Sequence, residues 1–306
     1  MQEPLSALSN AAPAVLLTGG TGFLGQHLVG LLRKEFPNGN MYMVVRPGKE
    51  ALAKKHKAMP LVYDGTIRST EGWQIAASTE TYVIHAATYF LAKHKPADID
   101  SMIDSNIAFG VHLLEWLSSL QHAVLISLGS FSQFRDGQRD SQNLYVATKN
   151  AYEPFLDYYS SLGRTKICSI YMSDTYGPND PRRKVLNLLI DACREHNHLS
   201  LSPGLQELSL LYVDDACSGI VAALQARISN DSGKRLNYSL FASRPYKLIE
   251  IGALVEKIVG VSGFLHFGEL PYRHNEIMKF VPAFASPPGW NAQTDLEQGI
   301  FKLVKN

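Results

Sequence analysis

The sequence predicts an α/β protein in which helices cover both faces of a doubly wound parallel sheet, with a smaller C-terminal lobe. Short apolar stretches alternate with helical periodicity over most of residues 1–172, as in a parallel sheet with crossover helices. A glycine-rich turn joins the first apolar stretch to the first helical one. Most of residues 173–306 has a more mixed pattern and more proline, which predicts the smaller lobe.

Six strands are expected from short runs of mostly apolar residues. They are Ala14–Thr18, Met41–Val45, Pro60–Tyr63, Tyr82–His85, Ala123–Ser127 and Lys166–Met172. Helices lie between most of them, for example over Ile103–Leu120. Glu207–Val213 is expected to form another strand that returns to this sheet, so the segment near 205–228 is assigned to the first domain.

The glycine-rich turn has the spacing of a dinucleotide-binding loop. Gly19 permits a tight turn, Gly22 lets the backbone approach a pyrophosphate, and Gly25 lets the helix pack close to the strand. The N-terminus of the helix offers free N–H groups and the positive end of its dipole to the phosphates. The residues expected to contact the cofactor here are Gly19, Thr21, Gly22, Phe23, Leu24 and Gly25. In this strand–turn–helix context the motif predicts dinucleotide binding by residues 1–172.

Tyr145 and Lys149 are four residues apart on a predicted helix, so their side chains share one face. A nearby ammonium favours the phenolate and lowers the pKa of a tyrosine. The pair is therefore expected to exchange a proton with a carbonyl or alcohol oxygen, with Tyr145 as the catalytic acid or base. Lys149 is also expected to contact the cofactor.

A serine is needed to hydrogen-bond the reacting oxygen. It should emerge at the carboxyl end of a strand, where ligands bind in open α/β sheets. Ser127 is expected to lie within the strand that starts at Ala123, whereas Ser130 follows Gly129 and should lie beyond its end. Ser130 is therefore the predicted catalytic serine, with Ser132 as the second candidate.

Further motifs extend along most of the chain. They are His85-Ala86-Ala87, Tyr176-Gly177-Pro178, Tyr212-Val213-Asp214-Asp215, Leu270–Glu276 and Gly289-Trp290 with Thr294–Ile300. With these motifs the chain resembles the extended short-chain dehydrogenases/reductases of the NAD-dependent epimerase/dehydratase family, in the branch that acts on nucleotide sugars.

The resemblance implies roles for residues that spacing alone does not assign. Asp64, Ala86 and Ala87 would contact the cofactor. The substrate would be a nucleotide sugar bound by Thr88, Asp174, Arg182, Arg273 and Glu276. Asp174 stands where many relatives have asparagine, and a carboxylate would repel a diphosphate. It would therefore face a sugar hydroxyl or act as a structural cap. A homodimer would form through a four-helix contact made by residues 103–120 and 145–161.

The end of the second strand indicates the cofactor. An acidic residue there would bind the ribose hydroxyls of NAD(H), but this chain has Arg46, which can accept the 2′-phosphate of NADP(H). NADP(H) is therefore favoured over NAD(H), although a solvated arginine in a turn would look the same. A hydride donor that is consumed in each turnover suits a reductase.

Three functions remain open. The favoured one is NADPH-dependent reduction of a 4-keto sugar of a nucleotide sugar, because the chain is similar to nucleotide-sugar 4-ketoreductases. The alternative is a nucleotide-sugar C4 epimerase with bound NAD. A non-catalytic NADP(H)-sensing protein is less favoured, because such sensors commonly lack the Tyr/Lys pair. Dehydration is disfavoured, since Phe131-Ser132 follows Ser130 where dehydratases carry an Asp-Glu pair.

Composition limits the partners. The formal net charge of +1 argues against a nucleic-acid partner, and the chain lacks an apolar run of about 18 residues that could span a membrane. Met1–Asn10 does not have the pattern of a secretory signal. The cysteines Cys168, Cys193 and Cys217 are scattered and suggest neither a disulfide framework nor a metal site. A cytoplasmic protein without a bound metal is expected.

Overall fold

The structure, a computed structural model, describes residues 12–305. Its main feature is a seven-stranded parallel sheet with the strand order β13-β8-β5-β4-β1-β2-β3. The strands are β1 (Ala14–Thr18), β2 (Asn40–Val45), β3 (Met59–Val62), β4 (Thr81–His85), β5 (Ala123–Ser130), β8 (Thr165–Met172) and β13 (Leu236–Leu240). The six strands predicted from the apolar runs are thus confirmed. The predicted absence of a secretory signal over Met1–Asn10 concerns residues outside the described range.

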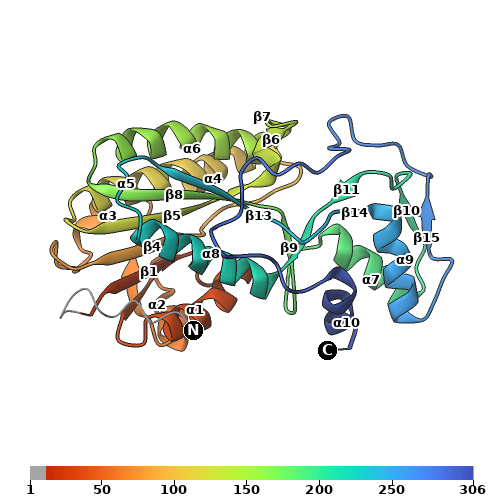
Figure 1. The fold of residues 1–306 in the computed structure, drawn as a ribbon, viewed down its shortest axis with the longest axis horizontal. Coiled ribbons are helices and arrows are strands. Elements are labelled where there is room, and N and C mark those ends of the chain that lie inside the picture. The colour runs from red at the N-terminus through yellow and green to blue at the C-terminus, as the bar shows by residue number, and fades with distance from the viewer. Residues whose placement is uncertain (1–11, 306) are drawn as a thin grey trace.

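Helices cover both faces of this sheet, so its strands are buried on both sides (Figure 1). Val15 and Leu17 of β1 belong to the core beneath α1 (Phe23–Glu35) and α8 (Val213–Ile228). Leu16 points to the other face, where it shares a core with α5 (Phe109–Ser118) and α6 (Leu144–Ser161). The alternation along one strand produces the two layers. The fold class that the sequence predicted is therefore confirmed.

The predicted helix over Ile103–Leu120 is longer and less regular than expected. It begins with α4 (Ile99–Ile103), passes through a π-helical turn at Asp104–Ala108 and continues as α5. Within the π-helical turn, Asn106 is buried and hydrogen-bonds the Thr88 hydroxyl, the Tyr89 backbone and the Thr148 hydroxyl. The widened turn thus carries a polar side chain toward the end of β4. Short helices α2 (Glu50–Lys55) and α3 (Arg68–Glu71) complete this lobe.

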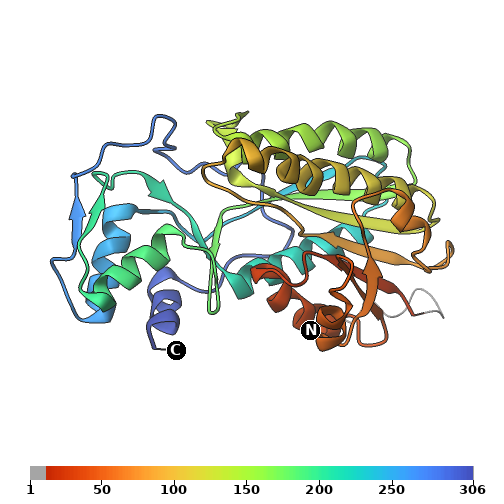
Figure 2. The same ribbon diagram turned by 180° about the vertical axis from the view of Figure 1, so that it is seen from behind.

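The smaller lobe lies at one end of the sheet and has its own apolar core (Figure 2). Its helices are α7 (Val185–Glu195), α9 (Leu248–Val259) and α10 (Leu296–Lys305). Strand pairs surround them: β10 (Leu199–Leu201) with β15 (Leu265–Phe267), β11 (Glu207–Leu208) with β14 (Tyr246–Lys247), and β12 (Leu210–Tyr212) with β9 (Asp174–Tyr176). A hairpin of β6 (Phe134–Arg135) and β7 (Gln138–Arg139) follows β5.

The prediction that Glu207–Val213 returns to the main sheet is wrong. This stretch divides into β11 and β12, which pair with β14 and β9 outside the main sheet. The seventh strand is β13, and its Leu-Asn-Tyr-Ser-Leu sequence is too polar to reveal an edge strand by apolar pattern. The apolar run at Leu210–Tyr212 indicated a buried strand correctly, but not its partner. The helix that follows it, α8, does pack on the main sheet.

Residues 290–300 connect the cores of the two lobes. Trp290 lies in the core between α8 and the sheet, and its indole N–H donates to Ser218 Oγ at 2.9 Å. Asp215 on α8 accepts from the backbone N–H groups of Gln293 and Thr294 at 3.1 and 2.8 Å. Ile300, on α10, is fully buried in the core of the smaller lobe. We call residues 290–300 the connecting segment.

No helix within residues 12–305 combines the length and the apolar character needed to cross a membrane.

Candidate active site

A cleft of about 1730 Å³ runs along the carboxyl ends of the main strands and into the smaller lobe. A pocket for one drug-sized ligand has roughly 300–1,000 Å³, so this cleft has room for two molecules side by side. The predicted site residues that line it are Gly19, Thr21, Gly22, Phe23, Leu24, Gly25, Arg46, Asp64, Ala86, Ala87, Thr88, Ser130, Tyr145, Lys149, Asp174, Arg182, Arg273 and Glu276. The fold thus brings the predicted residues together along one surface.

The glycine turn between β1 and α1 forms a cradle that side chains would fill. Gly19 has a φ of +68°, and a Cβ there would lie 2.7 Å from the backbone nitrogen of Ala87. A Cβ on Gly25 would lie 2.6 Å from the Cα of Gly20, so this glycine permits the close packing of helix and turn. Helix α1 starts without a side-chain cap and without an acidic residue in its first turn. These features fit the phosphates of a dinucleotide.

A buried polar chain supports the floor of this cradle. The Thr18 hydroxyl hydrogen-bonds His85 Nδ1 at 2.8 Å and accepts from the backbone N–H of Ala87 at 3.1 Å. Burial lowers the pKa of His85 to about 3, so its ring is neutral. His85 is therefore a packed, hydrogen-bonded scaffold residue. It holds the Ala86–Ala87 backbone beside Gly19.

The far end of the cleft follows β2 and β3. Arg46 is exposed directly after β2, in a turn that the Lys49 N–H closes by donating to the Arg46 carbonyl. Asp64 lies after β3, and its Oδ1 accepts from the backbone N–H and the hydroxyl of Thr66 at 2.8 and 2.7 Å. These bonds lower the pKa of Asp64. Within residues 12–305 the Arg46 guanidinium has no hydrogen-bond or ion-pair partner, and Lys49, which the sequence pattern did not indicate, adds a second cation to the cleft lining.

Tyr145 and Lys149 share the face of α6 that lines the cleft, as predicted, one helical turn apart. Lys149 Nζ donates to the carbonyl oxygen of Leu128 on β5 at 3.0 Å. Burial lowers the pKa of Lys149 to about 8. The pKa of Tyr145 is raised to about 12 by burial, against a smaller opposing effect of the Thr88 hydroxyl. The expected lowering of the tyrosine pKa by Lys149 is thus wrong for this state, and Tyr145 is held as a proton donor.

Ser130 is the last residue of β5, so the prediction that it lies beyond the strand is wrong by one residue. Its Oγ lies 2.7 Å from Ser132 Oγ and accepts from the Ser132 N–H at 3.3 Å. Ser127 is buried within the strand, whereas Ser130 and Ser132 both line the cleft. The preference for Ser130 over Ser132 stays a prediction, because both serines line the cleft.

Two acidic residues on the substrate side are already paired with cations. Asp174 Oδ1 accepts from Lys184 Nζ at 2.7 Å, and Lys184 is the main charge that lowers the pKa of Asp174 against the effect of burial. The carboxylate is therefore neutralised rather than repulsive. Arg182 binds both oxygens of Asp180 at 2.7 Å and the carbonyl of Thr175 at 3.0 Å. Its charge is engaged, which makes it a weaker diphosphate ligand than the sequence suggested.

Arg273 and Glu276 lie on an exposed loop that faces the cleft, and the Glu276 N–H donates to the Arg273 carbonyl at 3.1 Å. The loop is anchored just before them, where the Leu270 N–H donates to the Leu201 carbonyl at 3.0 Å. Glu269 adds to this anchor by accepting from Ser200 at 2.6 Å and by lying 2.8 Å from His198. Arg273 thus lines the cleft from an anchored loop and is exposed.

A family model described as the NAD-dependent epimerase/dehydratase family matches residues 15–238. The chain belongs to this family. The resemblance inferred from the sequence motifs is therefore confirmed, and the protein is an NAD(P)-dependent oxidoreductase of the short-chain dehydrogenase/reductase type.

Characterised relatives and solved structures align over nearly the whole chain. CDP-abequose synthase from Yersinia pseudotuberculosis is 27% identical, over 95% of this chain and 99% of that protein. UDP-glucuronate 4-epimerase 6 from Arabidopsis thaliana is 24% identical, over 95% of this chain and 71% of that protein. The structure of UDP-glucose 4-epimerase from Thermotoga maritima superposes with a TM-score of 0.77 at 17% identity, covering 95% of this chain and 97% of that one. The last similarity concerns the fold.

Proposed function

We propose that the protein reduces the 4-keto group of a nucleotide sugar with NADPH. The observation that carries the proposal is the order of groups along the cleft. Arg46 follows β2, the glycine cradle follows the neighbouring β1, and Ser130 ends β5 on the far side of β4, with Tyr145 and Lys149 on α6 lining the same cleft. A dinucleotide with its adenosine at Arg46 and its pyrophosphate on the glycine cradle would carry its reactive ring toward Tyr145. A CDP-abequose synthase as relative supports a nucleotide-sugar substrate.

The residues divide the chemistry among them. When bound, NADPH supplies the hydride that reduces the carbonyl carbon. Tyr145 donates a proton to the carbonyl oxygen; its pKa of about 12 means that the phenol carries this proton at neutral pH. Ser130 Oγ donates a hydrogen bond to the same oxygen. Lys149 is a cation below pH 8 and stabilises the negative charge that Tyr145 acquires.

The cofactor preference is proposed from Arg46. A guanidinium offers a fixed pair of donors to a phosphate, and the residue directly after β2 is this arginine rather than the acidic residue that would bind free ribose hydroxyls. Lys49 lies in the same turn and adds positive charge. Asp64 would contact the adenine side of the cofactor. The preference for NADP(H) over NAD(H) therefore rests on two cations at one strand end.

The substrate would lie between Tyr145 and the loop that carries Arg273. Arg273 is proposed to bind the diphosphate and Glu276 the ribose of the nucleotide. Asp174, neutralised by Lys184, would accept from a sugar hydroxyl without repelling the diphosphate. Thr88 would contact the sugar near Tyr145. Arg182 would act mainly as a scaffold, because Asp180 already occupies its guanidinium.

The test is incubation of the purified protein with NADPH and a panel of CDP-, UDP- and dTDP-linked 4-keto sugars. The expected result is a loss of absorbance at the wavelength of NADPH, with one alcohol epimer formed per NADPH consumed. The relative named above makes the CDP-linked substrate the first to test. Absence of NADPH oxidation with every member of the panel would contradict the proposal.

A second candidate is C4 epimerisation with a retained NAD, which the similarity to UDP-glucuronate 4-epimerases favours. An epimerase returns its hydride to the substrate and consumes no cofactor. Conversion of a 4-hydroxy nucleotide sugar into its epimer without added NADPH, together with NAD released on denaturation, would select this alternative. A cofactor-sensing protein would bind NADP(H) in these experiments but would convert neither the 4-keto nor the 4-hydroxy nucleotide sugars.

Assembly and location complete the proposal. We propose a homodimer through the outer faces of α4–α5 and α6, where Ile103, Phe155, Tyr158 and Leu162 are exposed. Light scattering at several concentrations tests it.

A cytoplasmic location is proposed because Cys168, Cys193 and Cys217 are free and buried, as in proteins of a reducing compartment.

A further inference from the structure

The segment after β5 forms a reciprocal cap around Ser130. Ser130 and Gln133 occupy the first and fourth positions of an S-x-x-Q sequence, the pattern of a capping box. The Ser130 hydroxyl accepts from the backbone N–H of Ser132, and the side-chain oxygen of Gln133 accepts from the backbone N–H of Ser130 at 2.9 Å. The cap thus contains the serine proposed to bind the reacting oxygen.

Gln133 is fully buried, and both ends of its amide are used. Its NH2 group donates to Asn150 Oδ1 at 3.1 Å and to Glu153 Oε1 at 3.2 Å, both on α6. Because these partners are acceptors, the amide oxygen must face Ser130. Gly129 leaves room for this arrangement, since a Cβ there would lie 2.6 Å from the amide oxygen of Gln133.

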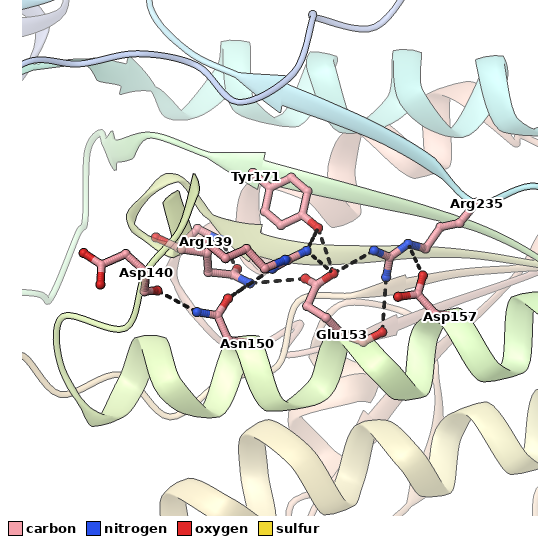
Figure 3. Close-up of polar contacts among 9 residues, drawn as sticks. Arg139, Asp140, Asn150, Glu153, Asp157, Tyr171 and Arg235 are labelled. Carbon is pink, nitrogen blue, oxygen red and sulfur yellow. Dashed lines mark hydrogen bonds and ion pairs between the residues drawn. The ribbon is translucent and has the colours of Figure 1, made fainter. Parts of the chain in front are cut away.

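Glu153 is itself held from three sides, as Figure 3 shows. Its Oε2 accepts from Tyr171 on β8, from Arg139 on β7 and from Arg235 before β13, each at 2.8 Å. The carboxylate is buried, and the two guanidinium groups compensate its charge. Glu153 also lies one helical turn after Lys149 on α6. It therefore gives Gln133 a fixed acceptor.

We propose that Gln133 is a positioning residue for Ser130, oriented by Glu153 and Asn150. The inference rests on the proposed function, in which Ser130 binds the reacting oxygen. Gln133 does not contact the substrate: it fixes the backbone of Ser130 at the end of β5, so that the hydroxyl keeps its direction into the cleft. A small displacement of such a donor lowers catalysis more than binding, because the transition state depends on alignment.

The experiment compares kcat in a double-mutant cycle of Gln133→Met and Ser130→Ala. Gln133→Met keeps the length of the side chain but removes the acceptor for the Ser130 N–H. We expect kcat to fall about tenfold, in the range of one lost hydrogen bond, while KM and the Kd for NADPH stay unchanged. In the Ser130→Ala background, Gln133→Met should cause no further loss, because its effect acts through the serine hydroxyl.

The controls separate this role from a structural one. Gln225→Met makes the same change on α8, where the Gln225 amide donates to Glu35 far from Ser130, and should leave kcat unchanged. NADPH binding and thermal unfolding show whether Gln133→Met folds. If it does not, Gln133→Ala replaces it in the double-mutant cycle, because it removes the same acceptor without adding atoms.

Two outcomes would overturn this inference without affecting the proposed function. One is a normal kcat for the Gln133 variant while Ser130→Ala has a reduced kcat. The other is that the Gln133 substitution lowers kcat by the same factor with Ser130 present and with Ser130→Ala. Near-normal turnover of Ser130→Ala would instead contradict the role of Ser130 in the proposed function.

Discussion

Lys149, one helical turn after Tyr145 on α6, donates to the carbonyl oxygen of Leu128 at 3.0 Å. The lysine thereby ties α6 to β5 two residues before Ser130. The proton of Tyr145 is retained mainly because burial, with a smaller effect of the Asp174 charge, raises its pKa to about 12. This relationship leads to the first two predictions.

Tyr145→Phe removes the proton donor but keeps the ring. Turnover should fall roughly 10²–10⁴-fold, the usual contribution of general acid catalysis. The Kd for NADPH should stay unchanged, because the ring still packs edge-on against Phe90. Stopped-flow reduction and fluorescence titration measure the two quantities. Tyr238→Phe, on the edge strand β13 and outside the cleft lining, is the matched control. Turnover close to that of the unmodified protein would exclude Tyr145 as the acid.

The pH dependence of kcat/KM should report Lys149. Burial lowers the pKa of Lys149 to about 8, so its ammonium is lost as pH rises through 8, while Tyr145, with a pKa of about 12, stays protonated. Activity should therefore be constant below pH 8 and fall above it. In Lys149→Arg the positive charge persists at high pH. The fall of kcat/KM above pH 8 should therefore disappear, even if the variant is slower than the unmodified protein. A wild-type profile that stays flat to about pH 9.5 would contradict this assignment.

Arg46→Ala should weaken NADPH about 10- to 100-fold and leave NADH nearly unchanged. Only NADPH carries the 2′-phosphate, and a hydrogen bond to a charged group contributes about 1.5–3 kcal/mol. Calorimetric titration of both cofactors measures the difference. Lys55→Ala removes an exposed cation from the nearby helix α2 and serves as the control. An equal loss for both cofactors would show that Arg46 does not discriminate between them.

Arg273→Ala should raise the Kd of the nucleotide sugar about 10- to 100-fold, for the same energetic reason. The affinity for NADPH should not change, because Arg273 lies on the loop anchored to β10 of the smaller lobe and is not part of the glycine cradle. Arg244→Ala, whose guanidinium rests 3.9 Å from the centre of the Tyr246 ring, is the matched control. The idea fails if nucleotide-sugar binding is unaffected or if NADPH loses as much affinity.

Glu153→Leu should destabilise the fold by about 3–5 kcal/mol, the usual cost of leaving buried charges without their partner. Arg139 and Arg235 would both lose the carboxylate that they share. Urea unfolding followed by circular dichroism gives the change in free energy. Asp231→Ala breaks the exposed ion pair with Lys166 and should leave the midpoint nearly unchanged. Similar midpoints for the two variants would mean that Glu153 is not structurally important.

Local pattern predicted those parts of the fold that depend on apolar runs. Six strands were found because each is a short hydrophobic segment, whereas β13 was missed because its polar residues lie at a sheet edge. The apolar run at Leu210–Tyr212 has the composition of a main-sheet strand, yet its partner is β9. Strand pairing depends on distant residues, which a local pattern does not contain.

The site was predicted where one motif contains all the participants, as in the glycine turn and the Tyr145–Lys149 pair. The prediction of the site was incomplete where the interacting residues come from different segments of the chain. Lys184 neutralises Asp174 from ten residues away, and no periodicity links the two. For Gln133 a signal existed: the S-x-x-Q spacing of a capping box directly after β5. Its meaning required the buried acceptor Glu153, twenty residues later on α6.

The connecting segment has a consequence for the order in which the protein is made. Every strand of the main sheet precedes residue 241, so the ribosome completes the sheet before Trp290 and Ile300 exist. The hydrogen bonds from Gln293 and Thr294 to Asp215 can therefore form only at the end of translation. The contact that this segment makes between the two cores is therefore a late event in the life of each chain, whereas β8 and β9, which follow each other along the chain, join the lobes much earlier. A nascent chain released at residue 288 would hold the glycine cradle but would not contain the segment that links the two cores.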